Sequence, residues 1–527
     1  MANWRKQMAG WIRRATRNEM DYLLGTLTVS VQCITLWSIY FDGFFDAPFK
    51  AAFVIISSVA GAGFYIGIIS RMVGKRHLPW IIAFASIWIL GLAWYANALS
   101  DLPHLSTFAV LVSEGRDVPI LAYFHSIPKA QILMALVTTS TYVVFVRVSE
   151  ERLSLDRLFI ATKAALSAGM LILYPPFGKP DYVWLDDVVR KHGLVIGWLV
   201  DGILTMRLRN PEADVAAIRQ NLLTRPVPSL KSLDHVDRAL VIQVESMDSE
   251  LLRNSTTPHM PYLAGILTKC SMDLLEPNYG ISGSSGSDFQ FLTGARPALP
   301  YPVYNSPAMN QIDSLPKKLR ASSVATYIYH NNTSRFWKRG PALKAMGIMA
   351  FDDAEIIPEH RKSKWGLADE DVVSHLIEKV KERPAPSLHF WITMSTHSPY
   401  DLIEGDAPGY FNSFKQLDRQ IQRLIEGISS QRIAFIIYGD HPSPGHRQYW
   451  PSSAFSPKVP CLSFINDHGV ISPLQIQRTA GVTYEIASLA SLLESVLVGH
   501  SNDYSSADHT LGQVRNHLHR TPVPQHH

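Results

Sequence analysis

The apolar positions of this 527-residue chain follow two different patterns, and the first is a set of long uncharged stretches near the N-terminus. No Asp, Glu, Lys or Arg occurs in residues 22–41, 51–70 and 78–100. Each stretch has at least 20 residues, and a helix of about 20 apolar residues crosses the hydrocarbon core of a bilayer. Two weaker stretches, 130–146 and about 158–174, bring the predicted number of transmembrane helices to five.

Basic residues in the connecting loops predict the orientation of these helices. Residues 1–21, 71–77 and 147–157 together carry eleven Lys and Arg, whereas the opposite loops 42–50 and 101–129 carry three. By the positive-inside rule, the N-terminus lies in the cytoplasm. Five crossings then place the C-terminal half outside the cytoplasm.

The sequence predicts three regions: a five-span transmembrane domain at 1–175, a connector at 176–234 and an extracytoplasmic domain at 235–527. Within the connector, residues 194–204 are apolar, but eleven residues are too few to cross a bilayer as a helix. They predict an interfacial helix. A sixth crossing there is the alternative, and it would move the C-terminal half into the cytoplasm.

The second pattern, beyond residue 235, consists of short apolar runs separated by amphipathic and Pro/Gly-containing segments. The four strongest runs are residues 239–244, 325–329, 388–394 and 433–438. Near-continuous apolar runs are typical of strands buried on both faces of a parallel sheet. Amphipathic stretches at 369–382 and 413–427 favour helices between them, so the predicted fold of this half is an α/β sandwich.

A polar group follows each of these runs. Ligands of open α/β sheets bind at the carboxyl ends of the strands, so these groups predict a site. Carboxylate, imidazole and hydroxyl groups form a plausible mixed ligand set for a divalent metal. The groups are Glu245, His330-Asn331-Asn332, Ser395-Thr396-His397 and Gly439-Asp440-His441.

A Gly/Ser-rich stretch from Gly280 to Gly294 has two interpretations. By composition alone it is a flexible linker. It also runs directly into an apolar segment that favours a helix, and a hydroxyl at a helix N-terminus lies where the helix dipole favours a phosphate.

Composition narrows the functional classes. Charged residues make up 18% of the chain and the formal net charge is +4, which is too small to indicate a nucleic-acid partner. Three cysteines, Cys33, Cys270 and Cys461, exclude a disulfide framework and a cysteine zinc site. One bridge, Cys270–Cys461, is the most that the extracytoplasmic half could form.

Several short motifs follow one another in a fixed order along the second half of the chain. They are Val-Glu245-Ser, Gly-Ser284-Ser-Gly-Ser-Asp-Phe, His330, Phe-Trp337-Lys-Arg339, Met-Gly347, Phe-Asp-Asp353, Thr-His397-Ser-Pro-Tyr and Tyr-Gly-Asp440-His441. This order resembles the lipoteichoic acid synthase branch of the alkaline phosphatase/sulfatase superfamily. Members include phosphoglycerol transferases that use phosphatidylglycerol, and a five-span N-terminal domain is also similar.

The resemblance implies roles for individual residues. Glu245, Asp440 and His441 resemble the ligands of one divalent ion, Mn²⁺ in the synthases, with Zn²⁺ or Mg²⁺ as alternatives. Ser284, where the family has a nucleophilic threonine, would also contact the metal, and the adjacent Ser285 is the alternative nucleophile. Asn332 falls where the synthases carry an acidic residue. The matching positions around the phosphoglycerol head group are His330, Asn332, Trp337, Arg339 and His397.

These roles imply a transferase in the bacterial cytoplasmic (inner) membrane. It would move phosphoglycerol from phosphatidylglycerol, through a phosphoserine, to a hydroxyl of a cell-envelope glycan or a polyglycerolphosphate chain. A phosphoethanolamine transferase is one alternative, although that group commonly has zinc and several disulfides. A sulfatase would need a Cys/Ser-x-Pro-x-Arg motif, which the Ser284 region lacks. A non-catalytic membrane sensor or export partner is the alternative from another class, and an intact ligand set argues against it.

Overall fold

The computed structural model describes residues 211–498, with gaps at 223–227, 231–235, 254–257, 279, 300, 364, 399–408, 444–448 and 451–455. The predicted transmembrane helices and the helix predicted at 194–204 lie outside these residues. Within the described part of the chain, every helix is too short or too polar to cross a bilayer. The five-span domain therefore stays a prediction.

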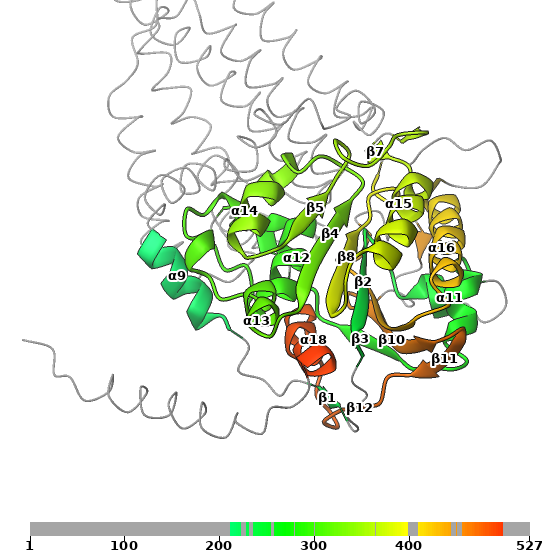
Figure 1. The fold of residues 1–527 in the computed structure, drawn as a ribbon. Helices are drawn as coiled ribbons and strands as arrows, with labels where there is room; N and C mark the ends of the chain where they lie inside the picture. Colours follow the sequence, from blue (N-terminus) through cyan, green and yellow to red (C-terminus); the bar gives the residue numbers. More distant parts are fainter. Residues whose placement is uncertain are drawn as a thin grey trace, which may run out of the picture.

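An eight-stranded sheet forms the centre of the described domain (Figure 1). The four predicted apolar runs are all strands of this sheet, as predicted. Strand β2 lies between β8 and β9, β4 lies next to β8, and all of these neighbours run parallel. Their bounds are β2 Arg238–Val244, β4 Ala325–His330, β8 Ser387–Ile392 and β9 Arg432–Gly439.

The outer strands complete the sheet on both sides. Strand β5 (Ala350–Asp352) extends it in parallel beside β4. On the other side β10 (Val459–Asp467) runs antiparallel to β9. Strands β3 (Met272–Leu275) and β11 (Val470–Pro473) both pair antiparallel with β10. A separate hairpin consists of β6 (Lys362–Ser363) and β7 (Gly366–Leu367).

Helices cover both faces of the sheet, because successive residues of each strand point to opposite faces and both faces are apolar. Ala239 and Val241 pack into one core cluster, and Leu240 and Ile242 into the other. The first face carries α12 (Ser284–Thr293), α13 (Leu315–Ala321), α14 (Arg339–Ala345) and α18 (Leu489–Val498). The second carries α10 (Glu250–Arg253), α11 (Pro261–Ile266), α15 (Asp369–Glu382) and α16 (Gly409–Gly427). The prediction of an α/β sandwich is confirmed.

Part of the predicted connector packs onto this domain. Helix α9 (Pro211–Gln220) buries Val215 and Ile218 in the first core cluster. Asp214 on the same helix accepts hydrogen bonds from the hydroxyls of Tyr301 and Ser306. Strand β1 (Ser229–Leu230) pairs with β12 (Ile476–Gln477). The packed domain thus extends N-terminal of residue 235.

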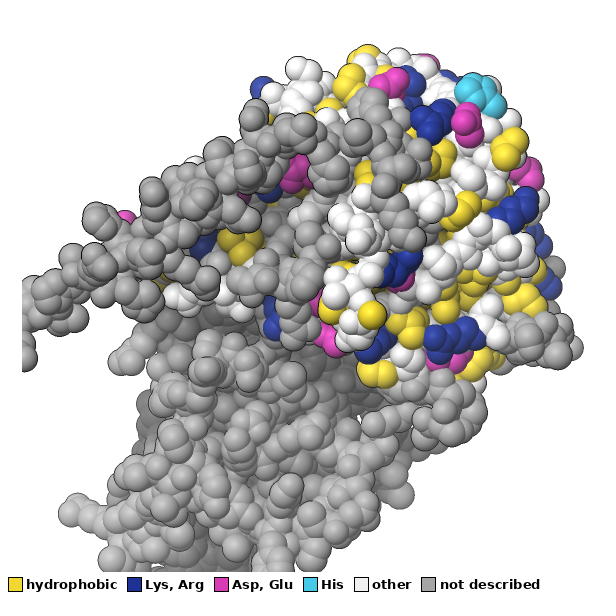
Figure 2. Space-filling view, turned by 90° about the horizontal axis from the view of Figure 1, so that it is seen from below, with side chains coloured by type: hydrophobic (Ala, Val, Ile, Leu, Met, Phe, Trp, Pro, Cys, Tyr) yellow, Lys and Arg dark blue, Asp and Glu magenta, His cyan; other side chains and the backbone are white. Residues whose placement is uncertain are grey.

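The surface charge is mixed, and the two cysteines of this domain are not paired. On the face shown in Figure 2, Lys and Arg side chains are interspersed with acidic and apolar ones. Cys270 is half-buried, Cys461 is buried, and both are free thiols. The one bridge that the sequence allows in this half is therefore not formed.

Candidate functional site

The carboxyl ends of β2 and β9 bring together the three predicted metal ligands. Val244 pairs with Gly439 in the parallel register, so Glu245 and Asp440 follow at neighbouring positions. A Cβ atom on Gly439 would lie 2.8 Å from the Met247 carbonyl oxygen, so only glycine permits this close approach. One ligand atom from each of Glu245, Asp440 and His441 lies within 4.8 Å of the others.

Helix α12 presents a serine hydroxyl to this cluster. The helix begins at Ser284, after Gly283 in a positive-φ conformation (φ 52°). Ser284 Oγ donates to Glu245 Oε2 at 2.6 Å and lies 3.4 Å from His441 Nε2. Gln243 Nε2 donates to the Ser284 carbonyl, and Ser287 Oγ donates to the Asp440 carbonyl. These contacts fasten the first turn of the helix to the ends of β2 and β9.

The geometry separates the two candidate serines. The Ser285 hydroxyl is fully buried and donates to the Ser282 carbonyl at 2.6 Å, whereas the Ser284 hydroxyl donates to Glu245. The linker interpretation of this stretch is wrong, because it forms the 3₁₀-helix η4 (Gly280–Ser282) followed by α12. Gly283 allows the tight turn that leads into α12, whereas composition alone suggested that this segment is a flexible linker.

Two buried carboxylates beside one imidazole give the cluster unusual electrostatics. Burial, together with the adjacent charge of Glu245, raises the pKa of Asp440 to about 8. Burial opposes ionisation of Glu245 as well, but His397 and His441 lower its pKa well below the usual value. Burial disfavours the charged form of His441, yet Asp440 and Glu245 outweigh it and raise the pKa to about 10. The cluster therefore favours a cation between its carboxylates.

The residues present fit a divalent metal. Asp440 Oδ1 accepts from the backbone N–H groups of Ser246 and His441 at 2.8 and 2.7 Å. Its second oxygen, Oδ2, is buried and accepts no hydrogen bond from the described residues. A buried carboxylate oxygen without a donor is costly unless a ligand supplies the missing positive charge. Two carboxylates, an imidazole and a hydroxyl suit a cation that accepts both oxygen and nitrogen ligands.

Arg339 and His330, both predicted near a head group, lie together and are fully buried. Arg339 Nε donates to Asp288 Oδ2 at 2.8 Å. His330 Nδ1 lies 3.0 Å from the Ile392 carbonyl, so Nδ1 carries the proton and Nε2 faces Arg339 Nη1 at 3.4 Å. Burial and the Arg339 charge lower the pKa of His330 to about 3. This histidine is therefore neutral and serves as an acceptor.

His397 lies in an aromatic environment at the end of β8. Its ring centroid is 4.1 Å from that of Trp365, whose indole nitrogen donates to the Ser398 carbonyl. Trp365 packs with Phe336 and Met394, and Trp337 packs against this group. Burial lowers the pKa of His397, although the Glu245 charge opposes the shift. His397 and Glu245 are thus within electrostatic reach of each other.

Trp337 and Asn332 both lie on the segment that follows β4. Trp337 has φ 58° and ψ 16°, a left-handed conformation that a bulky side chain rarely adopts. The strained turn, 3₁₀-helix η7 (Phe336–Lys338), leads into α14 at Arg339. Asn332 Oδ1 accepts from the Thr333 N–H at 2.7 Å, and its buried Nδ2 donates to none of the described residues. The side-chain N–H₂ group of Asn332 is therefore available to donate hydrogen bonds to a ligand.

Sequence reasoning missed three contributors to the site. Ser246, in a positive-φ conformation (φ 56°), donates to Glu245 Oε1 at 2.8 Å. Asp288 holds Arg339, and Trp365 contacts His397. The acidic-Phe pair at 288–289 was visible as a motif, but its partner is 51 residues away in the sequence. Trp365 follows the strand β6 and has no motif that marks it.

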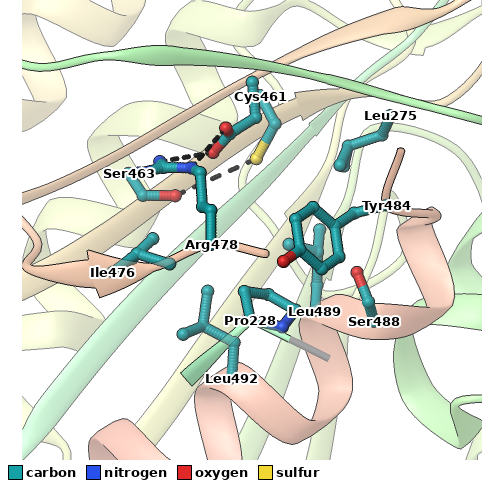
Figure 3. Close-up of a pocket in the computed structure, with 11 residues that line it drawn as sticks. Pro228, Leu275, Cys461, Ser463, Ile476, Arg478, Tyr484, Ser488, Leu489 and Leu492 are labelled. Atoms are coloured by element: carbon teal, nitrogen blue, oxygen red, sulfur yellow. Dashed lines mark hydrogen bonds and ion pairs between the residues drawn. The ribbon is translucent and has the colours of Figure 1, made fainter. Parts of the chain in front are cut away.

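A small pocket elsewhere in the domain is distinct from this cluster. Its free volume is about 10 Å³, the space of about one water molecule. Figure 3 shows its lining, to which β3, β10 and α18 contribute two residues each, with Arg478 paired to Asp273 at one side. None of the predicted site residues lines it.

Comparison with known proteins defines the class. A model of the sulfatase family matches residues 238–471, which include every residue of the site. The described domain is thus similar to the sulfatase family over the residues that contain the site.

Among curated proteins, the chain is similar to lipoteichoic acid synthase 2 of Bacillus subtilis (strain 168), with 24% identity over 225 residues, 38% of this chain and 35% of that protein. Lipoteichoic acid synthase 1 of the same organism is 24% identical over 151 residues, 25% of this chain and 24% of that protein. The domain is therefore lipoteichoic acid synthase-like. The chain spans about a third or less of the length of these relatives.

Among solved structures, the chain is similar to the integral membrane protein lipooligosaccharide phosphoethanolamine transferase A from Neisseria meningitidis. The TM-score is 0.54 at 10% identity, covering 92% of this chain and 95% of that chain. This similarity shows a shared fold.

Proposed function

We propose that the protein is a metal-dependent phosphoglycerol transferase that acts on phosphatidylglycerol. The observation that carries the proposal is the Ser284 hydroxyl, 2.6 Å from Glu245 within the Glu245–Asp440–His441 cluster. A serine at the start of a helix, beside a metal-binding set, is the arrangement that a phosphoryl-accepting nucleophile requires. Similarity to lipoteichoic acid synthases supports glycerol phosphate as the transferred group.

Glu245, Asp440, His441 and the Ser284 hydroxyl would hold one divalent cation, and we propose Mn²⁺, with Zn²⁺ or Mg²⁺ as alternatives. When bound, the cation would neutralise phosphoryl oxygens and favour ionisation of the serine hydroxyl. Ser246 and Thr393 support the ligand set, because Ser246 donates to Glu245 Oε1 and Thr393 Oγ1 accepts from the Glu245 N–H at 3.1 Å.

In the first step Ser284 Oγ attacks the phosphorus of the lipid in line with the diacylglycerol oxygen. The Ser284 proton is directed toward Glu245 Oε2, the acceptor in the structure. The bond from phosphorus to the diacylglycerol oxygen breaks, diacylglycerol leaves as the alcohol after taking up the proton that Ser284 released, and glycerol phosphate remains esterified to Ser284. In the second step an acceptor hydroxyl on a glycan or a polyglycerolphosphate chain attacks the phosphoserine. The P–O bond to Ser284 breaks, and the hydroxyl proton returns to Ser284.

The buried side chains around His330 would bind the phosphoglycerol group. Arg339 and His397 would contact phosphate oxygens, where charge accumulates during transfer. His330, Trp337 and Asn332 would surround the glycerol moiety. Since the Asn332 amide presents N–H donors, it suits a hydroxyl oxygen better than an ammonium group.

We also propose that the domain lies outside the cytoplasm, beside the outer leaflet that contains its lipid donor. The loop charges support this orientation, and so does the similarity to an integral membrane protein, which covers 92% of this chain. A reporter that is active only in the cytoplasm, fused after residue 220, should be inactive. Activity of that fusion would refute the orientation.

A phosphoethanolamine transferase is the second candidate, because the structure with the matching overall fold carries that activity in its name. The direct test is incubation of the full-length protein in vesicles with Mn²⁺ and either head-group-labelled phosphatidylglycerol or head-group-labelled phosphatidylethanolamine. We expect label from phosphatidylglycerol on the protein when no acceptor is added. Label only from phosphatidylethanolamine would establish the alternative, and no label from either lipid would refute the covalent mechanism.

A further inference from the structure

One helix carries both the proposed nucleophile and the partner of the buried arginine. Asp288 follows Ser284 by four residues on α12, so both side chains lie on the same face, one turn apart. Asp288 Oδ2 accepts from Arg339 Nε at 2.8 Å, and both side chains have no exposed surface. Arg339 also lies within electrostatic reach of Glu245 and His397.

The arginine is only partly satisfied by the protein. Asp288 engages Nε alone, and Nη1 faces His330 Nε2 at 3.4 Å. Nη2 is buried and has no hydrogen-bond acceptor among the described residues. Arginine–carboxylate pairs are frequently bidentate, with two parallel N–H···O bonds. Here a charged N–H₂ group is kept free, which is costly unless a ligand oxygen occupies that position.

A purely structural role explains this pair poorly. Arg339 is the first residue of α14, where a cation interacts unfavourably with the helix dipole. Buried ion pairs can often be replaced by apolar side chains without loss of stability. Burial also raises the pKa of Asp288 to about 6 despite the opposing effect of Arg339, so keeping this carboxylate ionised has a free-energy cost.

We propose that Asp288 is a positioning residue that orients Arg339 toward the phosphate of the lipid donor. By holding Nε, it directs Nη2 to the phosphoryl oxygens, and its place on α12 fixes the distance between this arginine and the attacking Ser284. This inference rests on the proposed function, because it assigns the phosphate to that reaction.

A double-mutant cycle in full-length protein tests whether Asp288 acts through Arg339. Asp288→Asn, nearly isosteric but uncharged, should lower kcat/KM for phosphatidylglycerol about 100-fold, as expected when a catalytic group is displaced by about 1 Å. Asp288→Asn combined with Arg339→Ala should be no less active than Arg339→Ala alone. If the two effects multiply instead, Asp288 acts independently of Arg339 and the proposal is wrong. The matched control is Asp352→Asn, which removes a carboxylate from another largely buried arginine, Arg383.

An activity-independent measurement separates this inference from the proposed function. Binding of inorganic phosphate to the Mn²⁺-loaded full-length protein in detergent should weaken about tenfold or more in Asp288→Asn, about 1.4 kcal/mol. Mn²⁺ affinity should be unchanged, and Asp352→Asn should bind phosphate normally. If Asp288→Asn does not fold, Asp288→Glu keeps the charge but displaces the guanidinium, and it should show the same loss of phosphate affinity.

Each result has a separate meaning. Weakened phosphate binding without transfer from phosphatidylglycerol in the wild type would support the positioning role and refute only the proposed function. Unchanged phosphate affinity in a folded Asp288 variant, with transfer intact in the wild type, would refute the positioning role alone.

Discussion

Two polar networks lie beneath the surface of this domain, and they differ in how completely they satisfy their own hydrogen bonds. The first, which we term the Arg383 network, joins Arg383, Asp352, His375, Tyr329 and His389. Arg383 donates to both Asp352 oxygens at 2.7 and 2.9 Å and to the Tyr329 hydroxyl at 2.9 Å. No polar side-chain atom of these five residues is among the buried atoms without a partner in the described part of the chain.

The second, which we term the site network, lies at the carboxyl ends of the strands and leaves four buried atoms without hydrogen-bond partners among the described residues. They are Asp440 Oδ2, Arg339 Nη2, Asp288 Oδ1 and Asn332 Nδ2. Buried polar atoms are nearly always satisfied in native proteins, so a cluster of exceptions needs an explanation. We propose that the Arg383 network contributes to the fold alone, whereas a cation beside Asp440 and a phosphate beside Arg339 would complete the site network.

The largest expected effect separates Ser284 from its neighbour. Ser284→Ala removes the atom that would carry the phosphoryl group, so transfer should fall by about four orders of magnitude or more. Ser285→Ala removes only a hydrogen bond to the Ser282 carbonyl and should cost about tenfold at most, about 1.4 kcal/mol. Transfer of labelled head group to acceptor measures both.

Peptide mapping of the labelled protein supplies the control for this prediction. Glycerol phosphate should be found on Ser284, and Ser284→Thr should keep partial activity because the hydroxyl is retained. Glycerol phosphate on Ser285 would show that the nucleophile is assigned one residue too early.

The next effect concerns the cation. Asp440→Ala removes one carboxylate of the cluster, and we expect it to abolish both Mn²⁺ binding, measured by calorimetry, and transfer. Excess chelator should inactivate the wild type, and added Mn²⁺ should restore it. Full activity in chelator, or in Asp440→Ala, would refute the metal assignment.

The central strands and the metal-ligand set could be predicted from the sequence. The strands follow from the local pattern of apolar residues, and the ligand set follows from the rule that ligands bind at the carboxyl ends of parallel strands. Apolar runs predicted β2, β4, β8 and β9, and the rule that parallel strands end at one edge placed Glu245 beside Asp440. These inferences need no knowledge of side-chain packing.

What the sequence could not provide depends on tertiary contacts. The separation of Ser284 from Ser285 is set by where α12 begins, after Gly283, and a shift of one residue would exchange them. The contact between Asp288 and Arg339 joins two helices 51 residues apart. Trp365 reaches His397 from a hairpin loop that has no motif.

A stability measurement sharpens the contrast between the two networks. Asp352→Asn removes the charge that holds Arg383 and His375, so it should lower the free energy of unfolding by about 1.5–3 kcal/mol, the range for hydrogen bonds to charged groups. Transfer activity per folded molecule should be unchanged at temperatures well below the unfolding midpoint. Thermal unfolding of the full-length protein in detergent, with activity measured on the same sample, checks both. If Asp352→Asn loses activity as Asp288→Asn does, the division between the networks fails.

The smallest effect is a pH dependence, which we follow through one histidine of each network. Burial, with the charges of Arg383 and Arg238, lowers the pKa of His389 to about 3, the same value that His330 has in the site network. An unfolded histidine has a pKa of about 6.5, so above that pH neither state binds the proton and the stability contribution is complete. Between about pH 6.5 and 3 the unfolded state binds a proton that the folded state rejects, and stability falls as the pH falls.

At pH 5.5 this linkage amounts to about 1.4 kcal/mol for each histidine relative to pH 7.5. His389→Gln keeps a group able to reach the Tyr329 and Ser387 hydroxyls, its partners at 2.8 and 3.1 Å, but it does not titrate. The variant should therefore lose about 1.4 kcal/mol less than the wild type between these two pH values, while His330 continues to contribute. Unfolding of both proteins in chelator, measured at the two pH values, gives the difference. An equal pH dependence in the two proteins would mean that His389 binds a proton in the folded state. The Arg383 network would then accommodate a charged histidine, contrary to this prediction.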